Sequence, residues 1–205
     1  MSPPSASAGP TRTSSSNRHR PAATVGRSEM HHPPTAVVPT DTGQFRAVLG
    51  HFGSGVTVIS AVDAATGRPV GFTCQSFTSL SLDPPLVAFT VARTSVTWPR
   101  IRSAGAFCVN VLAAGQESLC RSFARSGTDK FAGVDWRPAA GTGSPLLAGV
   151  LAWIDCRIEA VHPGGDHSIV IGRVQALAGP AGDTREPLLY YGSEFRRLAA
   201  TAPAP

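Results

Sequence analysis

Residues 151–177 read LAWIDCRIEAVHPGGDHSIVIGRVQAL, two long runs rich in apolar residues on either side of the polar stretch His162-Pro-Gly-Gly-Asp166. Proline and glycine in a short segment between two such runs are typical of a β-hairpin. We therefore predict two long strands over 151–161 and 168–177. Because the connection is too short for a crossover helix, the two strands must run antiparallel.

The rest of the chain repeats this pattern on either side of the hairpin. Further strands are predicted over 55–62, 70–73, 86–91 and 106–112, and a last element over 187–198. Short helices are predicted over 45–52, with Asp41 or Thr42 as N-cap, over 98–104, ending at Gly105, and over 116–125. Long helices do not alternate with the strands, so we predict a mainly β fold, a small antiparallel barrel with two or three short helices.

Composition divides the 205 residues into one domain and two tails. Residues 1–40 hold seven of the 18 prolines and no aromatic residue, so we predict that they are disordered, as is the tail 199–205. Residues 41–198 hold all 14 Phe, Trp and Tyr residues and form the predicted folded domain. The first tail carries four arginines and one glutamate, +3 of the net charge of +5. The domain has scattered arginines and only Lys130 as lysine, which disfavours a nucleic-acid-binding face.

The cysteines and the hydropathy pattern exclude further classes. Cys74, Cys108, Cys120 and Cys156 are spaced without a CxxC or Cys/His pattern, so no metal site is predicted. No segment approaches the roughly 18 consecutive apolar residues of a membrane span. We expect a soluble, cytoplasmic protein with reduced thiols.

A polar segment, TCQSFTSLSLDPP over residues 73–85, lies between two predicted apolar strands. Its hydroxyl and amide groups are neutral hydrogen-bond donors and acceptors, which suit a ligand with many polar edges and little charge. The alternative is a connecting loop whose side chains satisfy their own backbone.

Two shorter segments carry further candidates. Ser95, Thr97 and Arg100 place two hydroxyls and a cation at a predicted helix start, which is suited to phosphate, although an ordinary helix cap has the same residues. Asp166 and His167 follow two glycines at the end of the long hairpin, where they are a candidate site or simple turn residues.

The order of these segments resembles the short-chain flavin reductase family, whose members are the reductase components of two-component monooxygenases. The resemblance is carried, over residues 44–198, by GVTVIS (55–60), GFTCQSFTSLSLDPPL (71–86), FCVNVL (107–112), Phe123-Ala, GDHSIVIGRV (165–174) and PLLYY (187–191). It implies a Greek-key split β-barrel that binds flavin.

The resemblance also implies roles for individual residues. Thr73, Gln75 and Ser76 would face the isoalloxazine edge beside Cys74, which stands where relatives often have a small residue. Ser79 and Ser81 would contact ribityl or phosphate groups. His167 would lie near the nicotinamide, in a positioning or charge-stabilising role. The remaining implied flavin-site residues are Thr57, Ser95, Thr97, Arg100, Asn110 and Phe123.

The implied activity is an NAD(P)H:flavin oxidoreductase that supplies reduced FMN or FAD to a separate monooxygenase, with NADH or NADPH as co-substrate. The resemblance also implies a homodimer that completes the flavin site across its two-fold axis. A direct hydride transfer needs little acid–base machinery, which agrees with the scarcity of carboxylate pairs in the sequence. Two alternatives remain: a flavin-binding electron-transfer or sensor protein without efficient nicotinamide turnover, and a barrel recruited to protein interaction.

Overall fold

The computed structural model describes residues 41–179, 182 and 184–198. The predicted tails, 1–40 and 199–205, lie outside the described residues, so their disorder and the domain boundaries stay predictions. The described part contains three α-helices and three antiparallel β-sheets. No helix in it is long and apolar enough to cross a membrane.

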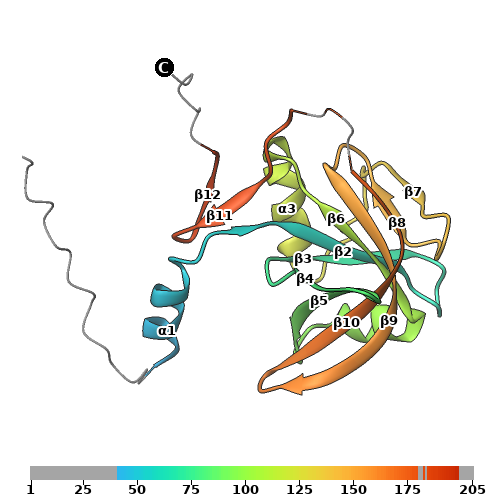
Figure 1. Ribbon diagram of the computed structural model, residues 1–205, viewed down its shortest axis with the longest axis horizontal. Coiled ribbons are helices and arrows are strands. Elements are labelled where there is room, and N and C mark those ends of the chain that lie inside the picture. The colour runs from blue at the N-terminus through green and yellow to red at the C-terminus, as the bar shows by residue number, and fades with distance from the viewer. Residues whose placement is uncertain (1–40, 180–181, 183, 199–205) are drawn as a thin grey trace, which may run out of the picture. The chain divides into compact units, whose positions relative to one another are not determined.

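The main sheet has seven strands in the order β3-β2-β6-β9-β10-β5-β4, and it coils into a split β-barrel (Figure 1). Every neighbouring pair is antiparallel, as the hairpin-rich sequence predicts. The strands are β2 (Thr57–Val62), β3 (Pro69–Cys74), β4 (Thr78–Leu82), β5 (Pro85–Ala92), β6 (Ala106–Val111), β9 (Ala152–Gly164) and β10 (His167–Ala178).

The long hairpin β9–β10 confirms the prediction from residues 151–177, with both strands reaching further into the turn. Gly165 forms the turn with a φ of 70°, a left-handed conformation that favours glycine. A β-carbon at Gly172 would collide with the ring of Phe107, so a glycine here lets the hairpin lie close over the core. His167 begins β10 and is paired with Ala92 at the end of β5.

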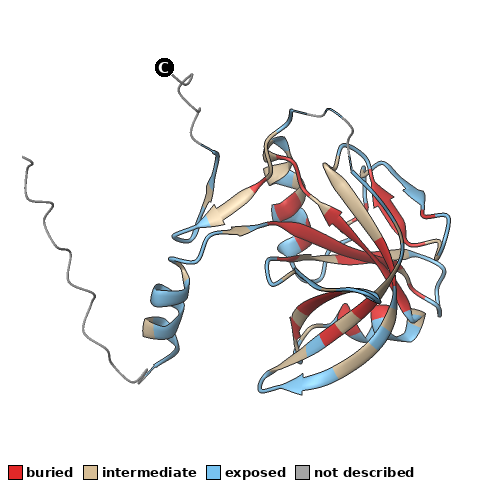
Figure 2. Cartoon of the chain, viewed as in Figure 1, coloured by how far each residue is buried: buried red, intermediate tan, exposed pale blue. Residues whose placement is uncertain are grey.

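The barrel core centres on Phe89, which is in edge-to-face contact with Phe107 and Trp98 at ring-centroid distances of 5.2 and 6.1 Å. Trp98 opens helix α2 (Trp98–Ala104), whose Trp98 and Ile101 are buried against the sheet. The helix ends at Gly105, with a φ of 68°, as predicted. Figure 2 shows the buried residues concentrated along the central strands.

A second core lies under helix α3 (Glu117–Ala124), which follows a 3-10 turn (Ala114–Gln116). Cys120 and Phe123, predicted to share one helix face, are buried, and Phe123 packs edge-to-face on Phe131 at 5.0 Å. This core joins α3 to the start of β2, and it leaves Phe123 beside the end of β3.

The structure corrects the sequence prediction at four places. Residues 74–83 were expected to be a loop, but they contain the edge strand β4, paired with β5. Two hairpins were not predicted: β7 (Trp136–Pro138) with β8 (Pro145–Leu147), and β11 (Leu189–Tyr191) with β12 (Glu194–Arg196). Their strands are three residues long, too short to show a period of two. The predicted strand 55–62 is divided at Val56 into β1 (Ser54–Gly55), which pairs with β11, and β2.

Two buried polar side chains attach the β7–β8 segment to the barrel. Asn110 on β6 is fully buried; its Oδ1 accepts the Leu147 N–H at 2.8 Å, and its Nδ2 donates to Ser60 Oγ at 2.9 Å and to Pro145 O at 3.3 Å. Asp155 on β9, also fully buried, accepts the N–H of Thr142 at 3.0 Å and the hydroxyl of the same residue. Buried polar groups require such partners, so these contacts fix the segment in one position.

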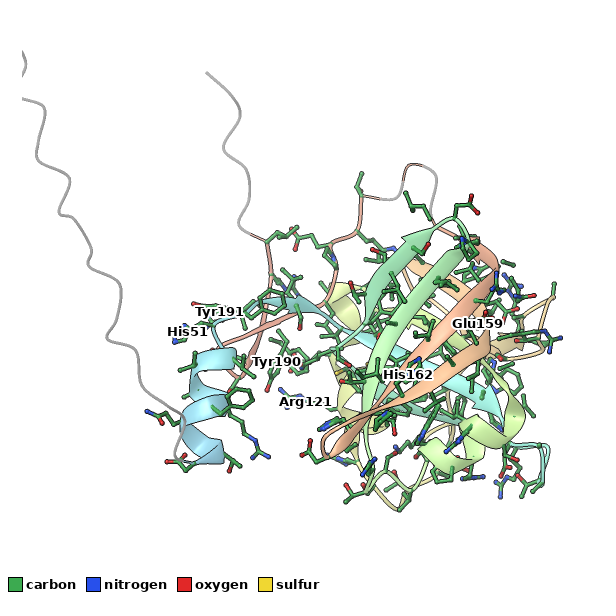
Figure 3. The ribbon with its side chains drawn as sticks, turned by 60° about the horizontal axis from the view of Figure 1, so that its bottom comes forward. His51, Arg121, Glu159, His162, Tyr190 and Tyr191 are labelled. Carbon is green, nitrogen blue, oxygen red and sulfur yellow. The ribbon has the colours of Figure 1, made fainter. Side chains whose placement is uncertain are left out.

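Helix α1 (Thr42–Leu49) begins at Asp41, one of the two predicted N-caps, whose carboxylate accepts the Gln44 N–H at 2.7 Å. None of the helix residues is buried. After the helix, His51 Nδ1 lies 3.3 Å from Tyr191 Oη on β11, and Figure 3 labels both side chains. The apolar residues predicted for one face are all exposed: Phe45 by 51%, Val48 by 64%, Leu49 by 53% and Phe52 by 80%.

Candidate functional site

A cavity of about 580 Å³, which we call the main cavity, opens where the ends of β3, β5 and β10 meet the C-terminal end of α3. Its lining includes the end of β3 with the polar segment that follows, which we call the polar wall, and residues 90–97, from the end of β5 to the start of α2. His167 at the start of β10, Phe123 on α3 and residues of the segment after α3 also line it. The main cavity thus brings together segments up to about 100 residues apart in sequence, in keeping with the antiparallel topology.

Eight of the predicted site residues line the main cavity, and they come from all of these segments except the one after α3: Thr73, Cys74, Gln75, Ser76, Ser95, Thr97, Phe123 and His167. Sequence reasoning missed part of its lining, including Phe72, Thr90, Thr94, Ser126 and Lys130. Of these, Lys130 carried a signal, because it is the only lysine in the sequence.

Hydroxyl groups fasten the polar wall to its neighbours. Ser76 Oγ accepts the N–H of Thr90 at 2.8 Å and donates to its carbonyl oxygen at 3.0 Å, which ties the end of β3 to β5. Thr73 Oγ1 donates to Cys120 O at 2.7 Å and ties β3 to α3. These hydroxyls bond the backbone of neighbouring elements, and not that of their own segment as the connecting-loop alternative expected, and both residues line the main cavity.

Cys74 is 5% exposed, and its Sγ lies 3.3 Å from Ser76 Oγ. Burial in apolar surroundings raises the pKa of its thiol, because the thiolate would lose its hydration. At neutral pH Cys74 therefore stays protonated and acts as a small, polarizable packing group at the cavity wall.

A second cavity of about 300 Å³, which we call the basic cavity, adjoins the first and shares Val96, Thr97 and Lys130 with it. Its lining contains three cationic side chains, Arg68, Arg100 and Lys130, and one carboxylate, Asp129, which pairs with Arg68 at 3.5 Å. The predicted residue Arg100 lies here and not in the main cavity. The excess of positive charge suits an anionic group.

Lys130 stands between the two cavities. Its Nζ donates to the carbonyl oxygen of Gly71 at 3.2 Å, and partial burial lowers the pKa of the amine. Gly71 itself allows the wall to form: a β-carbon there would lie 2.8 Å from Ile59 O and 2.9 Å from Phe123 Cε1. Any larger residue would push Phe123 out of its place in the main cavity.

His167 reaches the main cavity from the tip of the long hairpin. Its Nδ1 lies 2.7 Å from a carboxylate oxygen of Asp166, and this hydrogen bond lowers the pKa of Asp166. A carboxylate partner favours a proton on Nδ1, so the neutral ring presents Nε2 as an acceptor. The arrangement orients the imidazole and fixes which nitrogen can meet a ligand.

Four predicted site residues lie outside both cavities. Thr57 is buried, and its Oγ1 donates to Cys74 O at 2.9 Å, so it supports the polar wall from behind. Asn110 is buried on β6, where its amide groups are used to hold the β7–β8 segment. Ser79 and Ser81 lie on the edge strand β4. In the single chain Thr57 and Asn110 therefore have structural roles, and Ser79 and Ser81 line neither cavity.

Comparisons with known proteins assign the chain to a family and agree with its fold. The family described as "Flavin reductase like domain" matches residues 49–199. The chain belongs to this family. The reductase subunit HsaB of a flavin-dependent monooxygenase from Rhodococcus jostii is 49% identical over 169 residues, covering 80% of this chain and 83% of that protein.

Solved structures of flavin reductases share the fold. A nitrilotriacetate monooxygenase component B homologue from Mycobacterium thermoresistibile superposes with a TM-score of 0.74 at 45% identity, covering 80% of this chain and 90% of the other. The NADH:FAD oxidoreductase SgcE6 of Streptomyces globisporus C-1027, in complex with NAD and FAD fragments, gives 0.76 at 40% identity, covering 82% and 99%. The mainly β split barrel predicted from sequence is confirmed.

Proposed function

We propose that the protein is an NAD(P)H:flavin oxidoreductase that reduces FMN or FAD and delivers the reduced flavin to a separate monooxygenase. The observation that carries the proposal is the main cavity of this flavin reductase family member, which is lined by the neutral polar segment and by His167 and adjoins the basic cavity. The relatives add support, since HsaB is named as a monooxygenase reductase subunit and SgcE6 as an NADH:FAD oxidoreductase.

The two cavities suit the two chemical parts of a flavin. The amide of Gln75 and the hydroxyls along the main cavity offer neutral hydrogen-bonding groups to a polar ring system, and Phe72 and Phe123 add apolar surface. The basic cavity offers Arg68, Arg100 and Lys130 to a phosphate, which the guanidinium groups bind in a forked geometry. One flavin would then span both cavities past Thr97.

Flavin, when bound, accepts a hydride from a reduced nicotinamide, and the protein's task is to orient the two rings and to exclude water. Gln75 and the backbone of the polar wall orient the ring system. His167, held by Asp166, presents Nε2 to the nicotinamide side of the main cavity and positions the carboxamide by accepting a hydrogen bond. No residue is required to move a proton for the hydride step.

An assay with the purified protein tests this function. NADH or NADPH is combined with FMN or FAD in all four pairs, and oxidation of the nicotinamide is followed by its absorbance. Many turnovers per protein molecule are expected with at least one pair. Reduction of a single equivalent would favour the electron-transfer alternative, and a protein that binds neither flavin would overturn both readings.

We also infer that the protein works in the cytoplasm as a homodimer. Four large apolar side chains of α1 and the turn after it are between 51% and 80% exposed, and none of the helix is buried. A short helix is marginal in water unless it packs its apolar face on another surface. A second copy of this chain can provide that surface, because a two-fold axis packs the same face of one copy against the same face of the other.

The substitution Val48→Asp is expected to shift the protein from dimer to monomer, raising the dimer dissociation constant at least about tenfold, because a charge would enter the covered face. Sedimentation velocity over a range of concentrations measures the effect. Ala47→Asp is the matched control, because it adds the same charge one residue away on the opposite side of α1. Equal effects of both variants, or a monomeric parent protein, would contradict the inference.

A further inference from the structure

Asp63 is an almost buried carboxylate in the turn between β2 and β3, with a side chain only 7% exposed. It accepts three hydrogen bonds: from the N–H of Ala65 at 3.1 Å, from the hydroxyl of Thr66 at 2.9 Å, and from Nε of Arg100 at 2.8 Å. The turn is closed further by the Asp63 N–H, which donates to Arg68 O at 2.9 Å. One carboxylate therefore connects this turn to helix α2.

The bond to Asp63 uses only the Nε edge of Arg100. The guanidinium has two further nitrogens, and its side chain lines the basic cavity while remaining 45% exposed. A planar guanidinium held at Nε has its orientation fixed, so its terminal nitrogens are aimed before a ligand arrives. The N–H of Ala65 and the charge of Arg100 lower the pKa of Asp63, which keeps the carboxylate ionised at neutral pH.

The same carboxylate also organises the backbone at Arg68, the second arginine of the basic cavity, whose side chain is 73% exposed. Arg68 is the last residue of the turn. Its backbone N–H donates to Thr66 Oγ1 at 3.3 Å, and the same Thr66 hydroxyl donates to Asp63. Asp129, the carboxylate in the cavity lining, is exposed, and it contacts Arg68 at 3.5 Å on the surface. Such exposed pairs contribute little to stability.

We propose that Asp63 is a positioning residue, which aims Arg100 at the phosphate of the bound flavin. The proposal rests on the proposed function, in which that phosphate occupies the basic cavity. The positioning role predicts the opposite change in FMN affinity from the one expected from the net charge of the cavity alone. Removing a nearby negative charge should strengthen the binding of an anion, whereas removing a positioning group should weaken it.

The test compares FMN with riboflavin, which lacks the phosphate, by measuring both dissociation constants from flavin fluorescence. Asp63→Asn keeps a side-chain oxygen for the turn but loses the charge that holds Arg100. It is expected to weaken FMN binding roughly tenfold and to leave riboflavin binding within about twofold. Asp129→Asn is the charge-matched comparison: it removes a carboxylate from the lining of the same cavity and, as a simple loss of negative charge, should tighten FMN binding.

Further variants separate this proposal from the function on which it rests. Arg100→Ala should weaken FMN binding at least as much as Asp63→Asn, and adding Asp63→Asn to it should cause little further loss. Asp63→Glu, which retains the carboxylate, should restore part of the affinity for FMN. If Arg100→Ala weakens FMN binding but Asp63→Asn does not, the positioning role is overturned.

Two other outcomes are equally decisive. Equal weakening of FMN and riboflavin by Asp63→Asn would show a general structural role and overturn the proposal. If Arg100→Ala binds FMN as tightly as the parent protein, the phosphate does not lie in the basic cavity. The positioning role of Asp63 is then overturned, while the proposed flavin reductase activity is not. The reductase assay with riboflavin, which requires no phosphate contact, identifies this second case.

Discussion

Replacement of His167 by alanine is expected to lower kcat/KM for the reduced nicotinamide by roughly 10- to 100-fold and to leave flavin affinity within about threefold. The reason is geometric. His167 lines the main cavity at the start of β10, and its Nδ1 lies 2.7 Å from Asp166, so Nε2 is the ring nitrogen that would meet the proposed nicotinamide. The variant loses that contact but keeps every group proposed to orient the flavin.

Anaerobic stopped-flow reduction of bound flavin, over a range of NADH concentrations, separates nucleotide binding from the hydride step. The matched control is His162→Ala. His162, labelled in Figure 3, lies on β9 of the same hairpin, opposite Ile169, and it does not line either cavity. It should show parental kinetics. Unchanged kinetics in the His167 variant would remove this residue from the site, and a loss of flavin affinity would reassign it to the flavin.

Replacement of Asn110 by alanine is expected to lower the free energy of unfolding by about 3 kcal/mol, which corresponds to a fall in Tm of roughly 10 °C. The amide is fully buried and makes two hydrogen bonds to the backbone of β8. Its loss leaves the Leu147 N–H and the Pro145 carbonyl each without one hydrogen bond, in a place that water reaches poorly. Removing the amide also creates a small cavity.

Urea unfolding at one fixed protein concentration measures the loss, and Gln116→Ala is the matched control. The Gln116 amide makes bonds of the same kind, accepting the Ala113 N–H at 3.0 Å and donating to Ala148 O at 2.9 Å. It is partly exposed, so water can replace it, and the cost should stay below about 1 kcal/mol. Equal costs for both variants would show that burial does not decide the contribution of Asn110.

The sequence alone predicts those elements that carry a long hydropathy pattern or a clear end signal. The β9–β10 hairpin has strands of 13 and 12 residues, and its turn contains two glycines and a proline, so both its strands and its direction are visible in the sequence. Helix α2 was bounded correctly because Gly105 adopts the left-handed conformation that ends helices. Strands β7 and β8 have three residues each and give no such signal.

Site residues were predictable as segments and less so one by one. The polar segment after β3 and the segment before α2 do meet at the main cavity, but which way each side chain turns depends on burial, which no local pattern shows. Asn110 is an example. An amide in an apolar strand can contact a ligand or hold neighbouring backbone inside the core, and its hydrogen bonds with Ser60 and Leu147 show that it does the second. Lys130 was missed because its neighbours in sequence, Thr128 to Phe131, form no regular element.

The single lysine gives the protein an unusual chemical property. Besides the α-amino group, Lys130 Nζ is the only primary amine in the chain, and it stands where the two cavities join. Its lowered pKa increases the uncharged fraction, which is the form that reacts with acylating reagents. A mild amine-selective label would therefore attach to one internal position, and the rate of labelling would report directly whether a ligand covers that position.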